Sequence, residues 1–215
     1  MSGHRLVRLA VAGVAAGALA LVGITPAHAA DPIAIADVQG IGPEAVGLGS
    51  TVTVEGVITG YYAAPSNYRG YYLQTVGSGG SGEDATPGAS DGIFVFFGSN
   101  DPGRAIGDLV RVTGTVAEFQ GQSQLSATVA ANHELLAADQ PLPDPVPLPD
   151  SVVGAEREAL EGMLVAPTGT YSLISTHQAF NFGTLWLGAG GMQTQPTEVA
   201  DAGSADAQAV AVANA

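Results

Sequence analysis

The sequence predicts an all-β protein built around a small barrel of five strands. Short segments with an apolar residue at every second position recur along the chain, which is the period of a half-buried strand. Gly supplies 30 of the 215 residues, and glycines stand inside these segments as well as between them. The chain has no Cys, so its core must hold the fold without disulfides.

The first and fourth strands carry the clearest signal. Residues 51–57 and 109–116 alternate apolar and polar side chains, and in both segments a glycine follows the second valine by two residues (Gly56 and Gly114). A glycine inside a strand favours a bend or a bulge. Because a barrel closes through such bends, the pattern favours a closed or partly open barrel over a flat sheet.

The remaining strands of the predicted barrel are shorter. We expect them at residues 70–75 and 93–97, and a weaker one at 124–129. With the two long strands they form one unit over residues 33–138.

A glycine-rich loop, residues 77–91, joins two of these strands and is expected at the surface. Glu83, Asp84 and Asp91 offer oxygen ligands of the kind that Ca²⁺ prefers, but their spacing matches no EF-hand loop. We therefore predict a solvated loop and assign no metal site.

Residues 139–150 carry a proline at every second position from Pro141 to Pro149. One interpretation is an extended linker. The other is an edge strand whose prolines remove the N–H donors along one edge only, so that it pairs on the other side. We favour the linker, because it requires no partner strand.

A smaller β unit is predicted over residues 151–199. Residues 151–160 are typical of a short helix, and residues 161–165 and 183–187 of strands.

The last segment, residues 200–215, begins like a helix. Ser204 is a suitable N-cap and Asp206 lies in the first turn. Because no stop signal follows, we expect the helix to be truncated and to lead toward a further domain.

Residues 1–30 are typical of a secretory signal peptide. Arg5 and Arg8 precede an apolar stretch from Leu9 to Ile24, and Ala27-His28-Ala29 supplies the small residues of a cleavage site. The apolar stretch is shorter than the ~20 residues that span a bilayer. The sequence therefore predicts a secreted, extracellular protein with no membrane segment after signal cleavage.

The charge balance excludes several function classes. The chain carries 20 Asp and Glu, six Arg and no Lys, a formal net charge of −14. Without the signal peptide, four Arg stand against 20 acidic residues, a net charge of −16. Tight binding of nucleic acid through many phosphate contacts is excluded by this balance. The lack of Cys excludes a thiol nucleophile and a cysteine metal site.

Five motifs in the same order resemble a known family. They are Val52-x-Val54-Glu55-Gly56-Val57, Tyr72-Leu73-Gln74, Ser90-Asp91-Gly92-Ile93-Phe94-Val95, Gly107-Asp108-x-Val110-x-Val112-Thr113-Gly114-x-Val116 and Leu160-Glu161-Gly162-Met163-Leu164-Val165. Together they resemble the N-terminal region of secreted bacterial extracellular nucleases of the endonuclease/exonuclease/phosphatase family. The resemblance implies an OB-fold-like nucleic-acid-binding barrel over 33–138, followed in the whole protein by a catalytic domain that uses Mg²⁺ or Ca²⁺. It implies no cofactor in the region present here.

No catalytic residue can be assigned. The Ser-Asp-His tripeptide typical of that family's last catalytic strand is absent. After the signal peptide only His133 and His177 remain as histidine bases. His133 follows Ala131-Asn132, and His177 lies in a polar stretch with no nearby carboxylate, whereas a catalytic base needs a positioned partner.

The sequence offers a candidate binding surface instead. Five of the six Tyr lie within residues 61–72, and aromatic rings on the second and third strands of an OB-type barrel stack on bases. Alternation lets only one of Tyr71 and Tyr72 face outward. The candidate residues for weak binding of single-stranded or extracellular nucleic acid are Tyr61, Tyr62, Arg69, Tyr72 and Arg111.

Three alternatives stay open. The rings can pack in the core, since large aromatics dominate core burial. Exposed rings can also stack on the sugars of a neutral polysaccharide, which suits an acidic carbohydrate-binding or adhesion module. Finally, the chain can be a spacer that only positions an enzyme.

Overall fold

A computed structural model describes residues 31–64, 68–81, 84–189 and 194–213 and is built mostly of strands. The predicted signal peptide, residues 1–30, and Glu83 of the glycine-rich loop lie outside the described residues. Within them, no helix is both long and apolar enough to cross a membrane.

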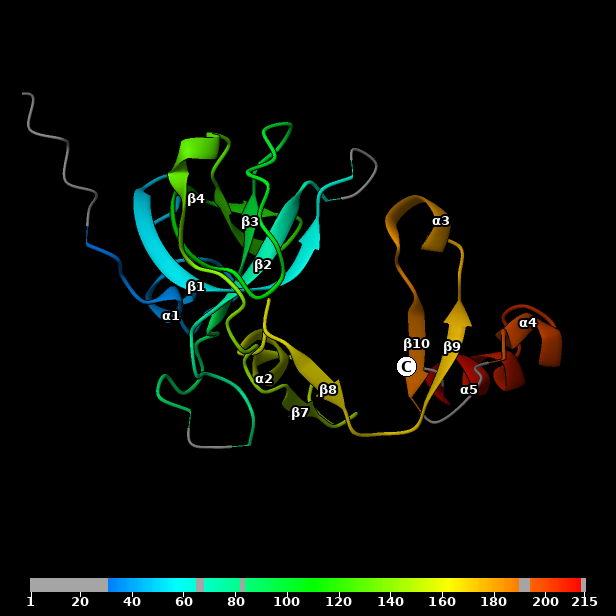
Figure 1. The fold of residues 1–215 in the computed structure, drawn as a ribbon. Helices are drawn as coiled ribbons and strands as arrows, with labels where there is room; N and C mark the ends of the chain where they lie inside the picture. Colours follow the sequence, from blue (N-terminus) through cyan, green and yellow to red (C-terminus); the bar gives the residue numbers. More distant parts are fainter. Residues whose placement is uncertain (1–30, 65–67, 82–83, 190–193, 214–215) are drawn as a thin grey trace, which may run out of the picture.

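Five strands form a closed barrel, which confirms the predicted fold class (Figure 1). Their order around the barrel is β1-β2-β3-β5-β4, and β4 pairs again with β1. Only β3 and β5 run parallel; the other neighbours are antiparallel. The strands are β1 (Thr51–Tyr62), β2 (Gly70–Gln74), β3 (Gly92–Phe96), β4 (Leu109–Phe119) and β5 (Gln122–Ser126).

The long strand β1 closes the barrel because it serves two neighbours. Residues Thr51–Val57 pair with β4, and residues Val57–Tyr62 pair with β2. Gly56 lies at the change of partner, where a Cβ atom would stand 2.6 Å from the carbonyl oxygen of Gln74. This is the bend that the sequence predicts at that glycine.

Two further elements, which the sequence does not predict, lie against the closed barrel. Strand β6 (His133–Ala137) follows a short 3₁₀ helix, η1 (Ala130–Asn132), and pairs with β4. Helix α1 (Ile35–Gln39) packs against the barrel and contributes Ile35 and Val38 to the core. With five residues, α1 is too short to show a helical period in the sequence.

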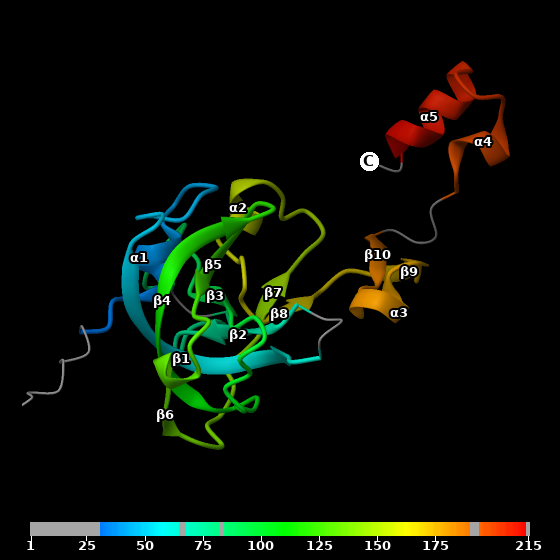
Figure 2. The same ribbon diagram turned by 90° about the horizontal axis from the view of Figure 1, so that it is seen from above.

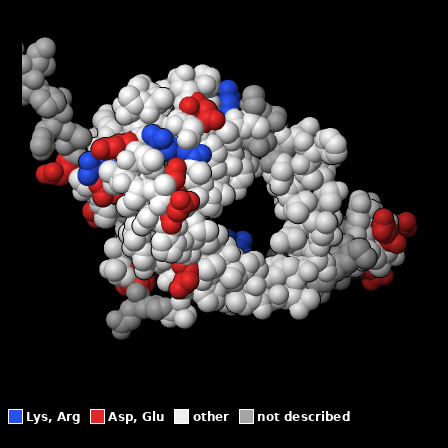
Figure 3. Space-filling view, viewed as in Figure 1, with Lys and Arg blue, Asp and Glu red and all other residues white. Residues whose placement is uncertain are grey.

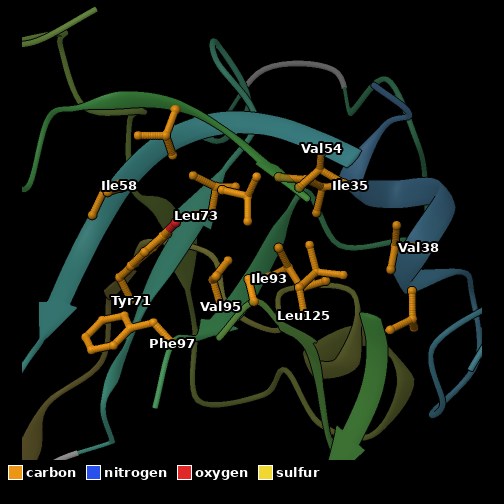
Figure 4. Packing of buried hydrophobic residues seen from close by; sticks show 14 of the residues in the cluster. Ile35, Val38, Val54, Ile58, Tyr71, Leu73, Ile93, Val95, Phe97 and Leu125 are labelled. Atoms are coloured by element: carbon orange, nitrogen blue, oxygen red, sulfur yellow. The ribbon is translucent and has the colours of Figure 1, made fainter. Parts of the chain in front are cut away.

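The core lies inside the barrel and is made of aliphatic and aromatic side chains (Figure 4). Every barrel strand contributes at least one of them. Its labelled members are Ile35, Val38, Val54, Ile58, Tyr71, Leu73, Ile93, Val95, Phe97 and Leu125.

The proline-rich segment combines an irregular part with a short strand. Strand β7 (Val146–Leu148) runs parallel to β8 (Val165–Pro167). The Val146 N–H donates to the carbonyl of Leu164 and the carbonyl of Leu148 accepts from the Thr168 N–H. The segment thus pairs along a single edge over these three residues, as a strand with alternating prolines must.

Helix α2 (Ala155–Glu158) lies between β7 and β8, within the predicted helical range. The predicted strand at 161–165 is wrong except at its last residue, because β8 begins at Val165. Residues 161–164 instead place their polar groups against the barrel, which leaves them without a strand partner.

The C-terminal part is a hairpin followed by two helices. Strand β9 (Tyr171–Ser175) pairs with β10 (Trp186–Ala189), and helix α3 (Ala179–Phe182) lies in their connection. Helices α4 (Pro196–Val199) and α5 (Ala205–Ala213) follow and lie apart from the barrel in Figures 1 and 2. The N–H of Ala207 donates to Ser204 Oγ at 3.2 Å, which confirms the predicted cap.

A candidate binding face on the outside of the barrel

A β-bulge sorts the tyrosines of β1 onto two sides of the sheet. The register against β2 shifts between Ile58 and Gly60. Because one extra residue reverses the alternation, Ile58 and Tyr61 both pack toward the core, whereas Tyr62 points to the outside. Strict alternation from Ile58 would have placed Tyr62 inside.

Tyr61 occupies the end of the barrel interior. Its ring stacks on Tyr71 with a centroid separation of 5.7 Å and an interplanar angle of 9°, and it also contacts Phe97. Its hydroxyl donates to the Asp101 carboxylate. Burial and this hydrogen bond raise the pKa of Tyr61 to about 12. Tyr61 is therefore held by neighbours inside the barrel and does not share a face with Tyr62.

Tyr71 and His133 form a buried polar pair. The Tyr71 hydroxyl lies 2.6 Å from His133 Nδ1, and His133 Nε2 lies 2.7 Å from the carbonyl of Ala127. Since a carbonyl only accepts, Nε2 carries the proton and Nδ1 accepts from Tyr71. Burial lowers the pKa of His133. Both ring nitrogens are thus engaged in hydrogen bonds within the protein, and neither is available to accept a proton from a substrate.

Four rings cover the outer surface of β1, β2 and β3, and we call them the aromatic face: Tyr62, Tyr68, Tyr72 and Phe94. Tyr62 meets Tyr68 and Tyr72 edge to face, with centroids 5.6 and 6.0 Å apart. Tyr72 in turn meets Phe94 at 5.1 Å. Such edge-to-face pairs hold the rings in fixed orientations.

Glycines make room for these rings. A Cβ atom on Gly70 would collide with the ring of Phe94, and one on Gly60 would lie 3.3 Å from the ring of Tyr62. The two glycines therefore leave space for these rings close to the backbone, where any larger residue would displace them.

The rings differ in what they offer to a ligand. Phe94 is 5% exposed and supports the layer from below, whereas Tyr68 is 47% exposed. Tyr62 and Tyr72 are half-buried, and the Tyr72 hydroxyl accepts a hydrogen bond from Gln122 Nε2 at 2.9 Å. Tyr72 is the outward member of the Tyr71–Tyr72 pair, and Tyr71 belongs to the core.

A groove of about 340 Å³ runs along the aromatic face. One side comes from β1 and β2, and the other from the residues that precede and begin β8. None of its lining residues is charged: Thr59, Gly60, Tyr62, Tyr72, Gly162, Met163, Leu164 and Val165.

The two candidate arginines lie in different places. Arg69 directly precedes β2, next to Tyr68, and within the described part of the chain no carboxylate pairs with it. Arg111 lies on β4 between β1 and β6, where it pairs with Glu55 at 2.7 Å and Glu134 at 3.1 Å. Arg111 is thus away from the aromatic face, and two carboxylates compensate its charge.

The structure therefore brings together Tyr62 and Tyr72 and separates Tyr61 and Arg111 from them, while Arg69 follows Tyr68 directly in the chain. It adds Tyr68 and Phe94, which were not among the candidates. Phe94 has a signal in the sequence, because alternation in β3 turns it outward when Ile93 and Val95 face inward. The sequence holds no such signal for the groove residues 162–165, because Gln74 of β2, which binds Leu164, lies 90 residues away.

Acidic side chains lie on the barrel surface, whereas none lines the groove. Figure 3 shows them scattered over the barrel, whereas the surface of β9 and β10 is white. No charged residue stands between Glu161 and Glu198 in the sequence.

Among the described residues, no group of three or more His, Asp or Glu is arranged to hold a metal ion.

No known protein family, curated protein or solved structure matches this chain. Its function must be argued from the geometry of the barrel and its aromatic face.

Proposed function

We propose that the barrel is a non-catalytic binding module whose aromatic face stacks on the bases of single-stranded nucleic acid. In this proposal the chain is the N-terminal part of a secreted, metal-dependent endonuclease or phosphodiesterase, and the metal belongs to a further domain. The observation that carries the proposal is the layer of fixed, partly exposed tyrosine rings beside an uncharged groove.

The position of these rings supports the proposal. Barrels of this strand order bind oligonucleotides and oligosaccharides on strands 2 and 3 and on the loops after strands 1 and 4. Here Tyr62 ends β1, Tyr68 lies in the loop after it, and Tyr72 lies on β2. Base stacking on one such ring contributes about 1–3 kcal/mol, independently of sequence.

An electrophoretic mobility shift at low salt tests the proposal. We expect a labelled single-stranded oligonucleotide to shift with the wild-type protein, and Tyr62→Ala or Tyr72→Ala to weaken binding roughly 5- to 150-fold, the equivalent of one lost stacking contact. Tyr171→Ala is the matched control, because Tyr171 is the one tyrosine outside residues 61–72. Absence of a shift at high micromolar protein, or equal binding by all variants, contradicts the proposal.

The uncharged groove favours a second candidate function, the binding of a neutral extracellular polysaccharide. Tyrosine rings stack on sugars as well as on bases, and a neutral ligand avoids repulsion by the acidic surface. Retardation in affinity gels that contain polysaccharide, without any oligonucleotide shift, would favour this function over the first.

A further inference from the structure

Residues 161–165, which we call the strap, lie across the outside of the barrel and are held there by hydrogen bonds. The Ser90 hydroxyl donates to the carbonyl of Glu161 at 2.5 Å, and the Leu164 N–H donates to Gln74 Oε1 at 2.8 Å. Between these bonds the backbone of Gly162 lies directly on Gly92 of β3, with no space for a side chain.

The strap also forms one side of the groove. Four of the groove's eight lining residues, Gly162 to Val165, belong to it. The groove beside Tyr62 and Tyr72 is therefore complete only while the strap is docked.

A carboxylate holds the strap at its first residue. Glu161 Oε1 accepts a hydrogen bond from the Ser123 N–H of β5 at 2.8 Å. Glu161 Oε2 is buried and has no hydrogen-bond partner among the described residues. A buried carboxylate oxygen without a donor is costly when it is charged and much less so when it is protonated.

The surroundings of Glu161 add to this cost. Two acidic side chains face it, Glu118 from β4 and Glu158 from α2, together with the uncharged Tyr72 from β2. Among the described residues, Glu161 lines a surface hollow together with one cationic side chain, Arg157, whose guanidinium donates to the carbonyl of Val152. Burial, and then the charges of Glu158 and Glu118, raise the pKa of Glu161 to about 7.

We propose that the strap is a proton-controlled latch on the groove: it stays docked while Glu161 is protonated and loosens when that proton is lost to solvent. This inference rests on the proposed function only for its consequence, the regulation of ligand binding.

The direction of the effect follows from linkage. A carboxyl whose pKa is raised from 4.5 to about 7 in the docked state stabilises docking fully below pH 4.5, and that stabilisation is lost as the pH rises through about 7. Because Glu161 is partly exposed, solvent screening reduces the effect, and we expect a change on the order of tenfold between pH 5.5 and 8.5.

Amide hydrogen exchange measures the latch without any ligand. Relative to the core amide of Val112, we expect protection of the Ser123 and Leu164 amides to fall on the order of tenfold from pH 5.5 to 8.5 in the wild type. Glu161→Gln, which cannot ionise, should show no such fall, and Glu198→Gln should behave as wild type. A constant protection in the wild type, or the same fall in Glu161→Gln, overturns the latch.

A direct titration covers the case in which Glu161→Gln does not fold. In the wild type, the carboxyl carbon of Glu161 should titrate well above the ordinary range of glutamate in an NMR experiment. Titration at the ordinary pKa of an exposed glutamate overturns the proposal.

Oligonucleotide affinity over the same pH range separates the two proposals. We expect binding to weaken with rising pH in the wild type and to stay constant in Glu161→Gln. If amide protection falls with rising pH but no oligonucleotide binds, the latch is supported and the proposed nucleic-acid binding is contradicted. If the oligonucleotide binds the wild type with an affinity that does not depend on pH, the latch is contradicted.

Discussion

Neighbouring tyrosines of this barrel have different environments, and each environment decides what the ring can do. Tyr71 is fully buried and donates to His133, while Tyr72 carries its ring on the outer surface. Tyr61 and Tyr62 divide in the same way because of the bulge in β1. In each of the two strands, one tyrosine therefore packs toward the core, and its neighbour in the chain lies on the aromatic face proposed to bind the ligand.

The buried pair predicts a stability effect at Tyr71. We expect Tyr71→Phe to lower the free energy of unfolding by about 1–3 kcal/mol, since Nδ1 of His133 loses its donor inside the barrel. Urea denaturation measures the change. Tyr62→Phe is the control and should stay within about 0.5 kcal/mol, as expected for a partly exposed side chain. Equal losses in both variants would contradict the assigned role of the pair.

The same pair predicts acid sensitivity. The pKa of His133 is lowered from 6.5 by burial, so its contribution to stability is complete above pH 6.5 and is lost as the pH falls below that value. Glu161 acts in the opposite direction over the same range. In the Glu161→Gln variant, the Tm should therefore fall steadily from pH 6.5 to pH 5. A flat or rising profile in that variant would show that His133 accepts its proton without cost.

At the scale of the elements, glycines within strands determine where the aromatic face can form. Gly60 and Gly70 accommodate Tyr62 and Phe94, and Gly92 accommodates the strap. An added methyl group at Gly60 or Gly70 meets rings or backbone of the same sheet, and one at Gly92 meets the backbone of the strap.

Gly70 gives the sharpest test of this arrangement. We expect Gly70→Ala to destabilise the barrel by about 3 kcal/mol, because its Cβ would collide with Phe94 and with the carbonyl of Val95. Gly42→Ala is the matched control, since nothing lies within 4 Å of its Cβ position. Thermal unfolding compares the two variants. A Gly70→Ala protein as stable as Gly42→Ala would mean that the ring packing is not tight.

Elements with a local pattern could be predicted from the sequence, and those held by distant contacts could not. Alternation predicts the two long strands, β1 and β4, short strand-like segments predict the other three, and glycines in β1 and β4 predict closure. The sequence predicts both Tyr61 and Tyr62 at the binding surface, and it gives no sign of the bulge in β1 that turns Tyr61 inward and Tyr62 outward. The sequence predicts a strand at the strap, because nothing local reveals its partners Gln74 and Ser123, which lie 90 and 38 residues away.

For the whole molecule, the acidic charge limits the ways in which a polyanion can bind. Of the arginines in the described chain, Arg111 is paired with carboxylates, while Arg104 and Arg157 donate to backbone carbonyls. Arg69 is exposed and follows Tyr68 of the aromatic face directly in the chain. If the proposed function holds, the binding energy comes mainly from stacking and little from phosphate contacts.

This balance predicts a shallow salt dependence. With about one phosphate neutralised, affinity for a single-stranded oligonucleotide should fall about threefold or less between 50 and 200 mM salt. Fluorescence anisotropy at several salt concentrations measures the slope. A loss of a hundredfold or more would show that many phosphates are contacted and that stacking is not the main source of affinity.

Chemical-shift mapping of the isotope-labelled protein with a single-stranded oligonucleotide tests the central claim most directly, because it locates the ligand on the barrel. We expect the largest changes at Tyr62, Tyr68 and Tyr72 and along the strap, with Tyr171 and the Arg111 face unchanged. Changes centred on Arg111, Glu55 and Glu134, or no changes at millimolar oligonucleotide, would contradict the claim that the aromatic face is the binding surface.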